Sequence, residues 1–439
     1  MSNIKENKIY IFITLLIVTP LLAMIGNYAG LTNYLIWYIP NFIMFITGLK
    51  IIIINIKKVK IKEYKLLAIF MILSVISCLL AQNKYEAIFG SDYRLEGLIT
   101  YIGYLGFFYC GTKLIEQEKN KKIMNTFIIC ATIISIISLL RIDLTFKLQD
   151  IPKDIPYYFY QGPFSHFNHF GYYLLIANIC STIMYAYNQK AINKIRYYIC
   201  HIILLYTLVI NDTFGVYLSY LLILIVLTIY QIIKKQKIKE IIILIITFIT
   251  ISAITYRTDF NIHIVKRNFE ELFHDTKEIV NTENIEDIYE VGTSRGKLWS
   301  YGIKYIKKHP LIGYGFENVK YEYHKDDIIE SRPHNLILEQ SLNSGVISML
   351  AYITLIILII KSKLKNLRNI KLIHLLSLLV VIGYLTSSML GNSTFYVSPY
   401  FYVFLGITAQ NYFKESKNEL WFISNNTNLQ RRKIHKKMY

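Results

Sequence analysis

Long apolar runs separated by short basic segments dominate this chain. Runs of about 20 residues are long enough to cross a bilayer as helices. The first run lacks a small-residue cleavage site, so it is predicted to be a spanning helix and not a cleaved signal peptide. The pattern predicts an all-α polytopic membrane protein with about twelve transmembrane helices. These lie at residues 9–29, 33–56, 66–81, 97–115, 123–140, 167–187, 197–212, 214–233, 241–256, 336–360, 372–390 and 398–413.

The charges of the connecting segments predict the orientation. The chain has 48 Lys and Arg residues against 29 Asp and Glu, which is a formal net charge of +19. Cytoplasmic loops retain Lys and Arg. Of the 48 basic residues, 30 lie in the segments 1–8, 57–65, 113–122, 188–196, 234–240, 361–371 and 414–439, which follow the alternation expected of the spans. We therefore expect both termini in the cytoplasm, and we interpret the positive charge as a topology signal and not as nucleic-acid binding.

Four regions follow from this pattern. Residues 1–256 hold the first nine transmembrane helices, and residues 257–335 form one large extracytoplasmic loop with short interfacial helices. Residues 336–413 hold the last three spans, and residues 414–439 form a basic cytoplasmic tail. The five cysteines all fall in apolar spans without C-x-x-C spacing, so we interpret them as small buried hydrophobic residues.

The candidate chemistry lies at the end of the large loop. Residues 295–308 combine basic and aromatic side chains without an acid, which is typical of a helix that lies on the bilayer surface. Pro333 suits the first turn of a helix, which would place His334 at a helix N-terminus. The helix dipole lowers the proton affinity of such a histidine and keeps it neutral near pH 7. A neutral imidazole beside cationic groups suits a general base next to an anionic substrate, so His334 is the predicted catalytic residue.

A second polar cluster, His166, Asn168 and His169, lies at the entrance of the span 167–187. Its H-x-x-H spacing suits a metal, but no third ligand lies nearby in sequence, and the aromatic neighbours indicate an interface belt. We favour a structural or sugar-contacting role and predict neither a metal nor a cofactor. Asp326 and Asp327 are interpreted as solvated charges.

Three motifs, GTSRGKLW, HPLIGYG and PHNLILEQSLNSG, resemble the O-antigen ligase and polymerase superfamily of integral-membrane enzymes. The residues that carry the resemblance are Arg295, Trp299, Pro310, Leu311, Gly313, Gly315, His334, Asn335 and Gly345. The chain departs from the family pattern at Asn343, where an acidic residue is frequent, and at Ser348, where relatives have glycine. It also has Asp-Thr-Phe-Gly at 212–215 where many relatives have Ser-Arg-Gly. Arg94, in the stretch GSDYRLEG, is the candidate to replace that missing arginine.

The resemblance implies a metal-independent, inverting glycosyltransferase in the bacterial cytoplasmic membrane. Such an enzyme transfers or polymerises oligosaccharide from an undecaprenyl-diphosphate carrier on the outer face, in surface polysaccharide assembly. His334 would accept the proton of the attacking hydroxyl. Guanidinium groups would hold the diphosphate, and further polar residues would contact the acceptor or sugar. The diphosphate-binding residues would be Arg295, Arg332 and Arg94, and the sugar or acceptor contacts Asn335, His166, Asn168 and His169.

Two questions stay open at the level of sequence. The acceptor can be a glycan, a lipid or a protein, because polymerase, ligase and protein glycosylase share one chemistry and differ only in the acceptor. The alternative function is a transporter or flippase of polysaccharide or lipid-linked glycan. Ion-coupled transport normally places ionisable residues inside spans. In this chain the predicted spans are nearly free of charged residues, and Lys50 and Glu339 are the chief exceptions. The sequence therefore favours the enzyme over the transporter.

Overall fold

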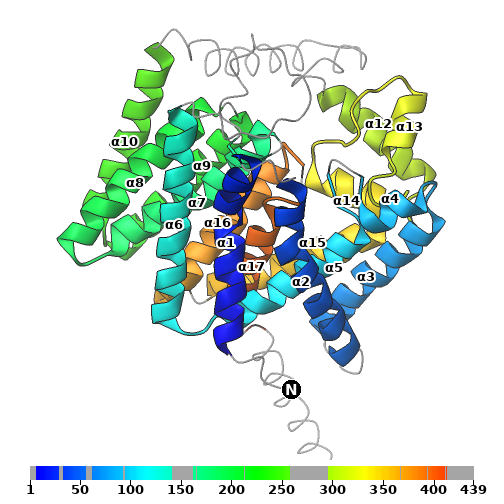
Figure 1. The fold of residues 1–439 in the computed structure, drawn as a ribbon, viewed down its shortest axis with the longest axis horizontal. Coiled ribbons are helices and arrows are strands. Elements are labelled where there is room, and N and C mark those ends of the chain that lie inside the picture. Colours follow the sequence, from blue (N-terminus) through cyan, green and yellow to red (C-terminus); the bar gives the residue numbers. More distant parts are fainter. Residues whose placement is uncertain are drawn as a thin grey trace, which may run out of the picture.

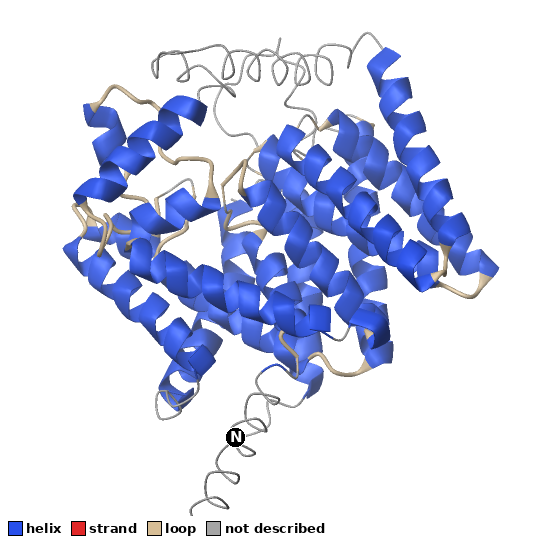
Figure 2. Cartoon of the chain, turned by 180° about the vertical axis from the view of Figure 1, so that it is seen from behind, coloured by secondary structure: helices blue, strands red, loops and turns tan. Residues whose placement is uncertain are grey.

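The computed structural model describes residues 6–28, 33–55, 62–91, 94–140, 162–164, 166–211, 213–257, 295–365, 367–392, 394–410 and 412. In this part of the chain every regular element is a helix (Figure 2). The N-terminal helices are α1 (Glu6–Tyr28), α2 (Asn33–Asn55), α3 (Lys62–Leu80), α4 (Lys84–Phe89), α5 (Leu98–Lys113) and α6 (Gln117–Leu139). They are followed by α7 (Phe167–Tyr187), α8 (Ala191–Ile210), α9 (Phe214–Lys234) and α10 (Ile238–Arg257).

The remaining helices belong to the large loop and the C-terminal region. The loop contributes α12 (Arg295–Lys308) and α13 (Lys320–Lys325). The C-terminal helices are α14 (Leu336–Ser344), α15 (Val346–Lys365), the 3-10 helix η4 (Leu367–Asn369), α16 (Leu372–Ser388) and α17 (Ser398–Thr408). The acidic first part of the loop, 258–294, and the tail from 413 onward lie outside the described residues.

Six described helices are long and apolar enough to cross a membrane, namely α1, α2, α6, α9, α10 and α15. Helices α3 and α16 contain shorter apolar stretches. The all-helical class is confirmed, and the chain is a multi-pass membrane protein. The other predicted spans coincide with α5, α7, α8 and α17, and their passage through the bilayer stays a prediction.

The predicted span 336–360 is wrong in one respect, because two helices occupy it. Gly345 separates α14 from α15 with φ +87°, in the left-handed region that only glycine adopts readily. The side chains of α14 explain the break. Five of its nine residues are buried polar or charged groups, which a lipid-facing helix does not accommodate. These are Glu339, Gln340, Ser341, Asn343 and Ser344.

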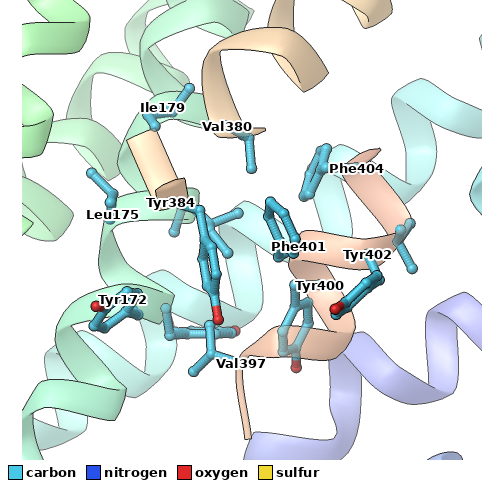
Figure 3. Packing of buried hydrophobic residues seen from close by; sticks show 14 of the residues in the cluster. Tyr172, Leu175, Ile179, Val380, Tyr384, Val397, Tyr400, Phe401, Tyr402 and Phe404 are labelled. Atoms are coloured by element: carbon cyan, nitrogen blue, oxygen red, sulfur yellow. The ribbon is translucent and has the colours of Figure 1, made fainter. Parts of the chain in front are cut away.

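An aromatic core at the centre of the molecule joins helices α7, α16 and α17. Helix α7 is buried from Phe170 to Ala186 and packs against α8, α9 and α16. The rings of Tyr384 on α16 and Phe401 on α17 stack with centroids 4.4 Å apart, and Tyr172 on α7 meets Tyr384 edge-on at 5.3 Å (Figure 3). Tyr172 also donates its hydroxyl to the Ser387 carbonyl at 2.9 Å. The core thereby fixes the outer end of α7 relative to the end of α16.

The loop helices α12 and α13 lie with α4 and α14 at one end of the molecule, away from the N-terminus (Figure 1). A small second core joins them, built from Leu298, Tyr305, Val319, Tyr323, Ile328 and Leu342. This core buries Leu298 and Tyr305 of α12 against α13 and α14, whereas Ile303 of the same helix is 46% exposed. The predicted contact of α12 with the bilayer surface stays a prediction.

Asp326 also differs from its interpretation as a solvated charge. It accepts hydrogen bonds from Lys304, at 2.7 Å, and from the Tyr305 hydroxyl. The bond from Lys304, followed by that from Tyr305, lowers the pKa of Asp326 below its ordinary value. This carboxylate ties the end of α13 to α12.

Candidate active site

His334 lies in the segment that joins the large loop to α14. Its backbone has φ +53°, which is uncommon outside glycine and tends to occur at functional sites. Its Nδ1 lies 3.2 Å from the carbonyl oxygen of Arg332. Because a carbonyl oxygen can only accept, Nδ1 carries the proton in this hydrogen bond and Nε2 is the basic nitrogen.

The start of α14 corrects the predicted position of His334. Asn335 is the N-cap residue, and its side-chain oxygen accepts from two backbone amides of the first turn at 3.0 and 3.1 Å. Pro333 and His334 therefore precede the helix, because the asparagine supplies the cap that favours a start at Leu336. The Asn335 amide donates to the Met389 carbonyl at 3.1 Å, so this side chain also joins α14 to the end of α16.

The imidazole of His334 is held in its neutral form. Burial lowers its pKa to about 4, and the positive charges of Arg295 and Arg94 act in the same direction. The low pKa agrees with the expected neutral imidazole, and burial and the two arginines are its causes. Two of the predicted arginines therefore lie close enough to act on His334. The role of His334 as a base stays a prediction.

Helix α12 positions both the segment before His334 and Arg295. The indole Nε1 of Trp299 donates to the carbonyl oxygen of Pro333 at 2.9 Å, which holds the residue just before His334. Arg295 is the first residue of the same helix, about one turn from Trp299. The Arg-x-x-x-Trp motif thus has a structural explanation, because one helix fixes the His334 segment and presents the arginine that acts on it.

The HPLIGYG motif holds the far end of α14. The amide of Tyr314 donates to the Leu342 carbonyl at 2.7 Å. Gly313 and Gly345 have φ +74° and +87°, and a Cβ on Gly313 would lie 2.8 Å from the amide nitrogen of Gly345. Any side chain at Gly313 would be strained and would clash, so these glycines serve the packing of α14 against the turn.

The second predicted cluster lies at the start of α7. Nδ1 of His166 caps the helix by accepting from the Asn168 amide at 3.2 Å, and the ring of His169 stacks on Tyr396 with centroids 5.3 Å apart. The Asn168 side chain accepts from Thr213 at 3.2 Å and so joins α7 to the start of α9. These contacts give His166 and Asn168 defined structural roles.

Arg94 connects the two clusters. Burial lowers the pKa of His166 to about 4, and the charge of Arg94 contributes to this shift as it does at His334. Arg94 lies between α4 and α5, Arg295 and His334 belong to the large loop before α14, and His166 precedes α7. The structure therefore brings together groups from three segments that the sequence singles out separately.

Arg332 occupies a different environment from the other two arginines. The sequence predicts it as a diphosphate ligand, but its guanidinium is buried and faces three carboxylates. It pairs with Glu96 at 3.1 Å, with Glu339 at 2.8 Å and with Glu317. Sequence reasoning missed this set. Glu339 is visible as a charge in an apolar run, but Glu96 and Glu317 carry no motif signal.

Burial and the opposing charge of Arg332 set the electrostatics of Glu339. Burial raises the pKa of Glu339, the charge of Arg332 lowers it, and the charges of Glu96 and Glu317 add to the increase. Among the described residues no group of three or more His, Cys, Asp or Glu side chains is arranged to hold a metal ion. The three carboxylates converge on the guanidinium of Arg332.

Comparison with protein-family models identifies the region that carries this site. Residues 199–353 match the O-antigen ligase family. The resemblance predicted from the three motifs is thereby confirmed. The matched region covers about a third of the chain, and it includes Arg295, Trp299, Arg332 and His334. A comparison with curated proteins found no match.

The region that matches the O-antigen ligase family contains one part of the site and leaves another part outside. It begins within α8, includes the whole of α9, α10 and α12 to α14, and ends within α15. Arg94, Glu96 and the cluster at the start of α7 lie outside it. His334, the Arg295 helix and the glycine turn therefore belong to the matched ligase region, and Arg94, Glu96 and the start of α7 come from the N-terminal half.

Proposed function

We propose that this chain is a membrane glycosyltransferase that transfers or polymerises oligosaccharide from an undecaprenyl-diphosphate carrier on the outer face of the cytoplasmic membrane. The observation that carries the proposal is the neutral His334, whose basic Nε2 lies near two arginines within the region that matches O-antigen ligases. The family supports lipid-linked glycan transfer in surface polysaccharide assembly. The acceptor is a growing glycan, a lipid or a protein.

The mechanism we propose is a direct displacement. Nε2 of His334 takes the proton of the acceptor hydroxyl as its oxygen forms a bond to the anomeric carbon. The bond from that carbon to the diphosphate oxygen breaks, and undecaprenyl diphosphate leaves with the electron pair. Arg295 and Arg94 stabilise the charge that develops on the diphosphate. Attack opposite to the leaving group inverts the anomeric centre.

The polar residues around this centre complete the proposal. His169 presents a ring stacked on Tyr396, an aromatic surface suited to a sugar ring, and His166 lies beside it with ring centroids 5.7 Å apart. We assign these two residues, with Asn168 and Asn335, to the neighbourhood of the acceptor or sugar. The hydrogen bonds of the two asparagines, from the Thr213 hydroxyl to Asn168 and between Asn335 and backbone groups, indicate that they also shape this region.

The proposal is tested by purifying the protein in detergent and adding undecaprenyl-diphosphate-linked oligosaccharide, which serves as donor and acceptor for a polymerase. The expected result is release of undecaprenyl diphosphate together with a longer glycan. Transfer should continue in EDTA, because fixed guanidinium groups can stabilise the leaving diphosphate. A gene-deletion strain shows which surface polymer or glycoprotein depends on the chain and so identifies the acceptor.

Two outcomes would contradict this assignment in different ways. A flippase would leave the donor chemically intact while moving it across the membrane of a proteoliposome. Loss of transfer in EDTA with recovery on adding Mg²⁺ or Mn²⁺ would overturn the metal-independent mechanism and leave the transferase in place.

We also propose that both termini face the cytoplasm and that the site faces outward. In a background without the five native cysteines, single cysteines at the exposed positions Lys84 and Lys325 should react with an impermeant maleimide added to intact cells. Cysteines at the exposed positions Glu118, Lys190 and Lys365 should react only after permeabilisation. The reverse pattern would place His334 in the cytoplasm and remove the proposed function.

A further inference from the structure

Arg332 joins three separate parts of the fold. Its residue is 4% exposed, and its guanidinium pairs with carboxylates from three elements. Glu96 lies between the first external loop and α5, Glu317 lies between the glycine turn and α13, and Glu339 lies in α14. Glu96 is itself held, because its other oxygen accepts from the Tyr104 hydroxyl at 2.6 Å. The ion pairs therefore tie the loop segment before His334 to the body of the protein.

The backbone of the same residue orients the proposed base. The carbonyl oxygen of Arg332 contacts Nδ1 of His334 at 3.2 Å. A partner on one imidazole nitrogen sets the tautomer and the direction of the ring, and so determines where the other nitrogen points. The side chain of Arg332 thus anchors the peptide group that orients Nε2.

Strained backbone surrounds this cluster. Leu95, Glu317 and His334 have φ of +58°, +59° and +53°, in a region that L residues seldom occupy. Leu95 adjoins Glu96, and the other two residues are a partner and a neighbour of Arg332. Such conformations persist only where the surrounding contacts over-determine them. The ion pairs of Arg332 are among the contacts next to all three residues.

We propose that Arg332 is a positioning residue that orients His334 through its backbone carbonyl, and that Glu96, Glu317 and Glu339 hold it in place for this purpose. The inference rests on the proposed role of His334 as base, and it replaces the predicted role of Arg332 as a diphosphate ligand. To grip a phosphate, this guanidinium would have to leave buried carboxylates that already satisfy it. Arg295 and Arg94 remain the diphosphate ligands.

The test separates kcat from the KM for the lipid-linked donor. In Glu317→Gln, Arg332 keeps its partners Glu96 and Glu339 but loses one tether. In Arg332→Lys the charge remains, but the planar fork that spans the carboxylates is lost. For a positioning residue, both variants should lower kcat roughly tenfold to a hundredfold, the range for groups that orient a reactive side chain, while donor KM changes less than about twofold.

A diphosphate ligand predicts a different pattern. Arg332→Lys would then raise donor KM, and Glu317→Gln would leave kcat unchanged and lower donor KM by freeing the guanidinium. That result would overturn the inference. The matched control is Glu86→Gln, since Glu86 lies on the same external side in α4 and pairs with Lys320 at 2.8 Å, away from Arg332. It should leave both constants unchanged.

Folding and the proposed chemistry are checked separately. Thermal unfolding and gel filtration show whether each variant is folded. If Arg332→Lys does not fold, the kinetic constants of Glu317→Gln and Glu317→Asp test the inference instead. Glu317→Asp keeps the negative charge but has a shorter side chain, which cannot reach the guanidinium as well. An inactive His334→Gln with a Glu317→Gln of wild-type kcat overturns the positioning role alone. An active His334→Gln overturns the base itself.

Discussion

Replacing His334 with asparagine or glutamine is expected to lower glycan transfer about 10²–10⁴-fold, the usual cost of losing a general base. Asparagine is the more stringent variant because it tolerates the left-handed backbone at this position. Both amides can donate a hydrogen bond, but neither has a nitrogen that accepts a proton near pH 7. The measurement is the rate of undecaprenyl diphosphate release by the purified protein.

The control for this prediction is His324→Gln, which changes an exposed histidine on α13 in the same external loop. It should retain the wild-type rate. His334 would have only a structural role if His334→Gln transferred glycan at close to the wild-type rate, and the proposed mechanism would then be wrong despite the family match.

Arg295→Ala is expected to weaken donor binding as well as turnover, because in the proposed mechanism the guanidinium contacts the diphosphate before and during its departure. Loss of a charge-assisted hydrogen-bonded contact costs about 1.5–3 kcal/mol, or about tenfold to a hundredfold in donor affinity. Arg295→Lys should restore little of this, since an ammonium cannot reproduce the bidentate fork. Donor affinity is measured with the lipid-linked substrate in detergent, and turnover from product release.

Lys307→Ala is the matched control, because Lys307 is an exposed basic residue in the last turn of the same helix. It tests whether any positive charge on α12 would serve. An equal loss of donor affinity in both alanine variants would indicate a general electrostatic effect, and the specific assignment of Arg295 would fail.

The helices were largely predictable because their signal is local. Apart from the short α4, apolar runs indicated the described helices of the N-terminal half and α16 and α17 with ends within about six residues, whereas the run 336–360 covers both α14 and most of α15. The break at Gly345 was not predicted, although the glycine was part of the family motif. At the break Gly345 packs closely on the turn around Gly313, which lies in a different segment and leaves no trace in the hydrophobic pattern.

The sequence predicted which residues form the candidate site, but not how they are arranged in space. His334, Arg295 and Arg94 were named from motifs, and the structure places the two arginines close enough to act on His334. Burial, the main cause of the low pKa of His334, could not be derived from the sequence, because it depends on neighbours that a linear pattern does not identify. The packing of α12 on Tyr323 and Leu342 was missed for the same reason.

The sequence by itself determined the helical class, the succession of apolar segments and the identity of the histidine and arginines, because hydrophobicity and motif spacing are properties of short stretches. Tertiary structure alone decided what each charge faces. Arg332 pairs with Glu96 across 236 positions of the chain, so its role could not be derived from its neighbours in sequence. Charges act through space over a few ångströms, and only the packing of α5, α13 and α14 around the loop places Arg332 among three carboxylates and Arg295 near His334.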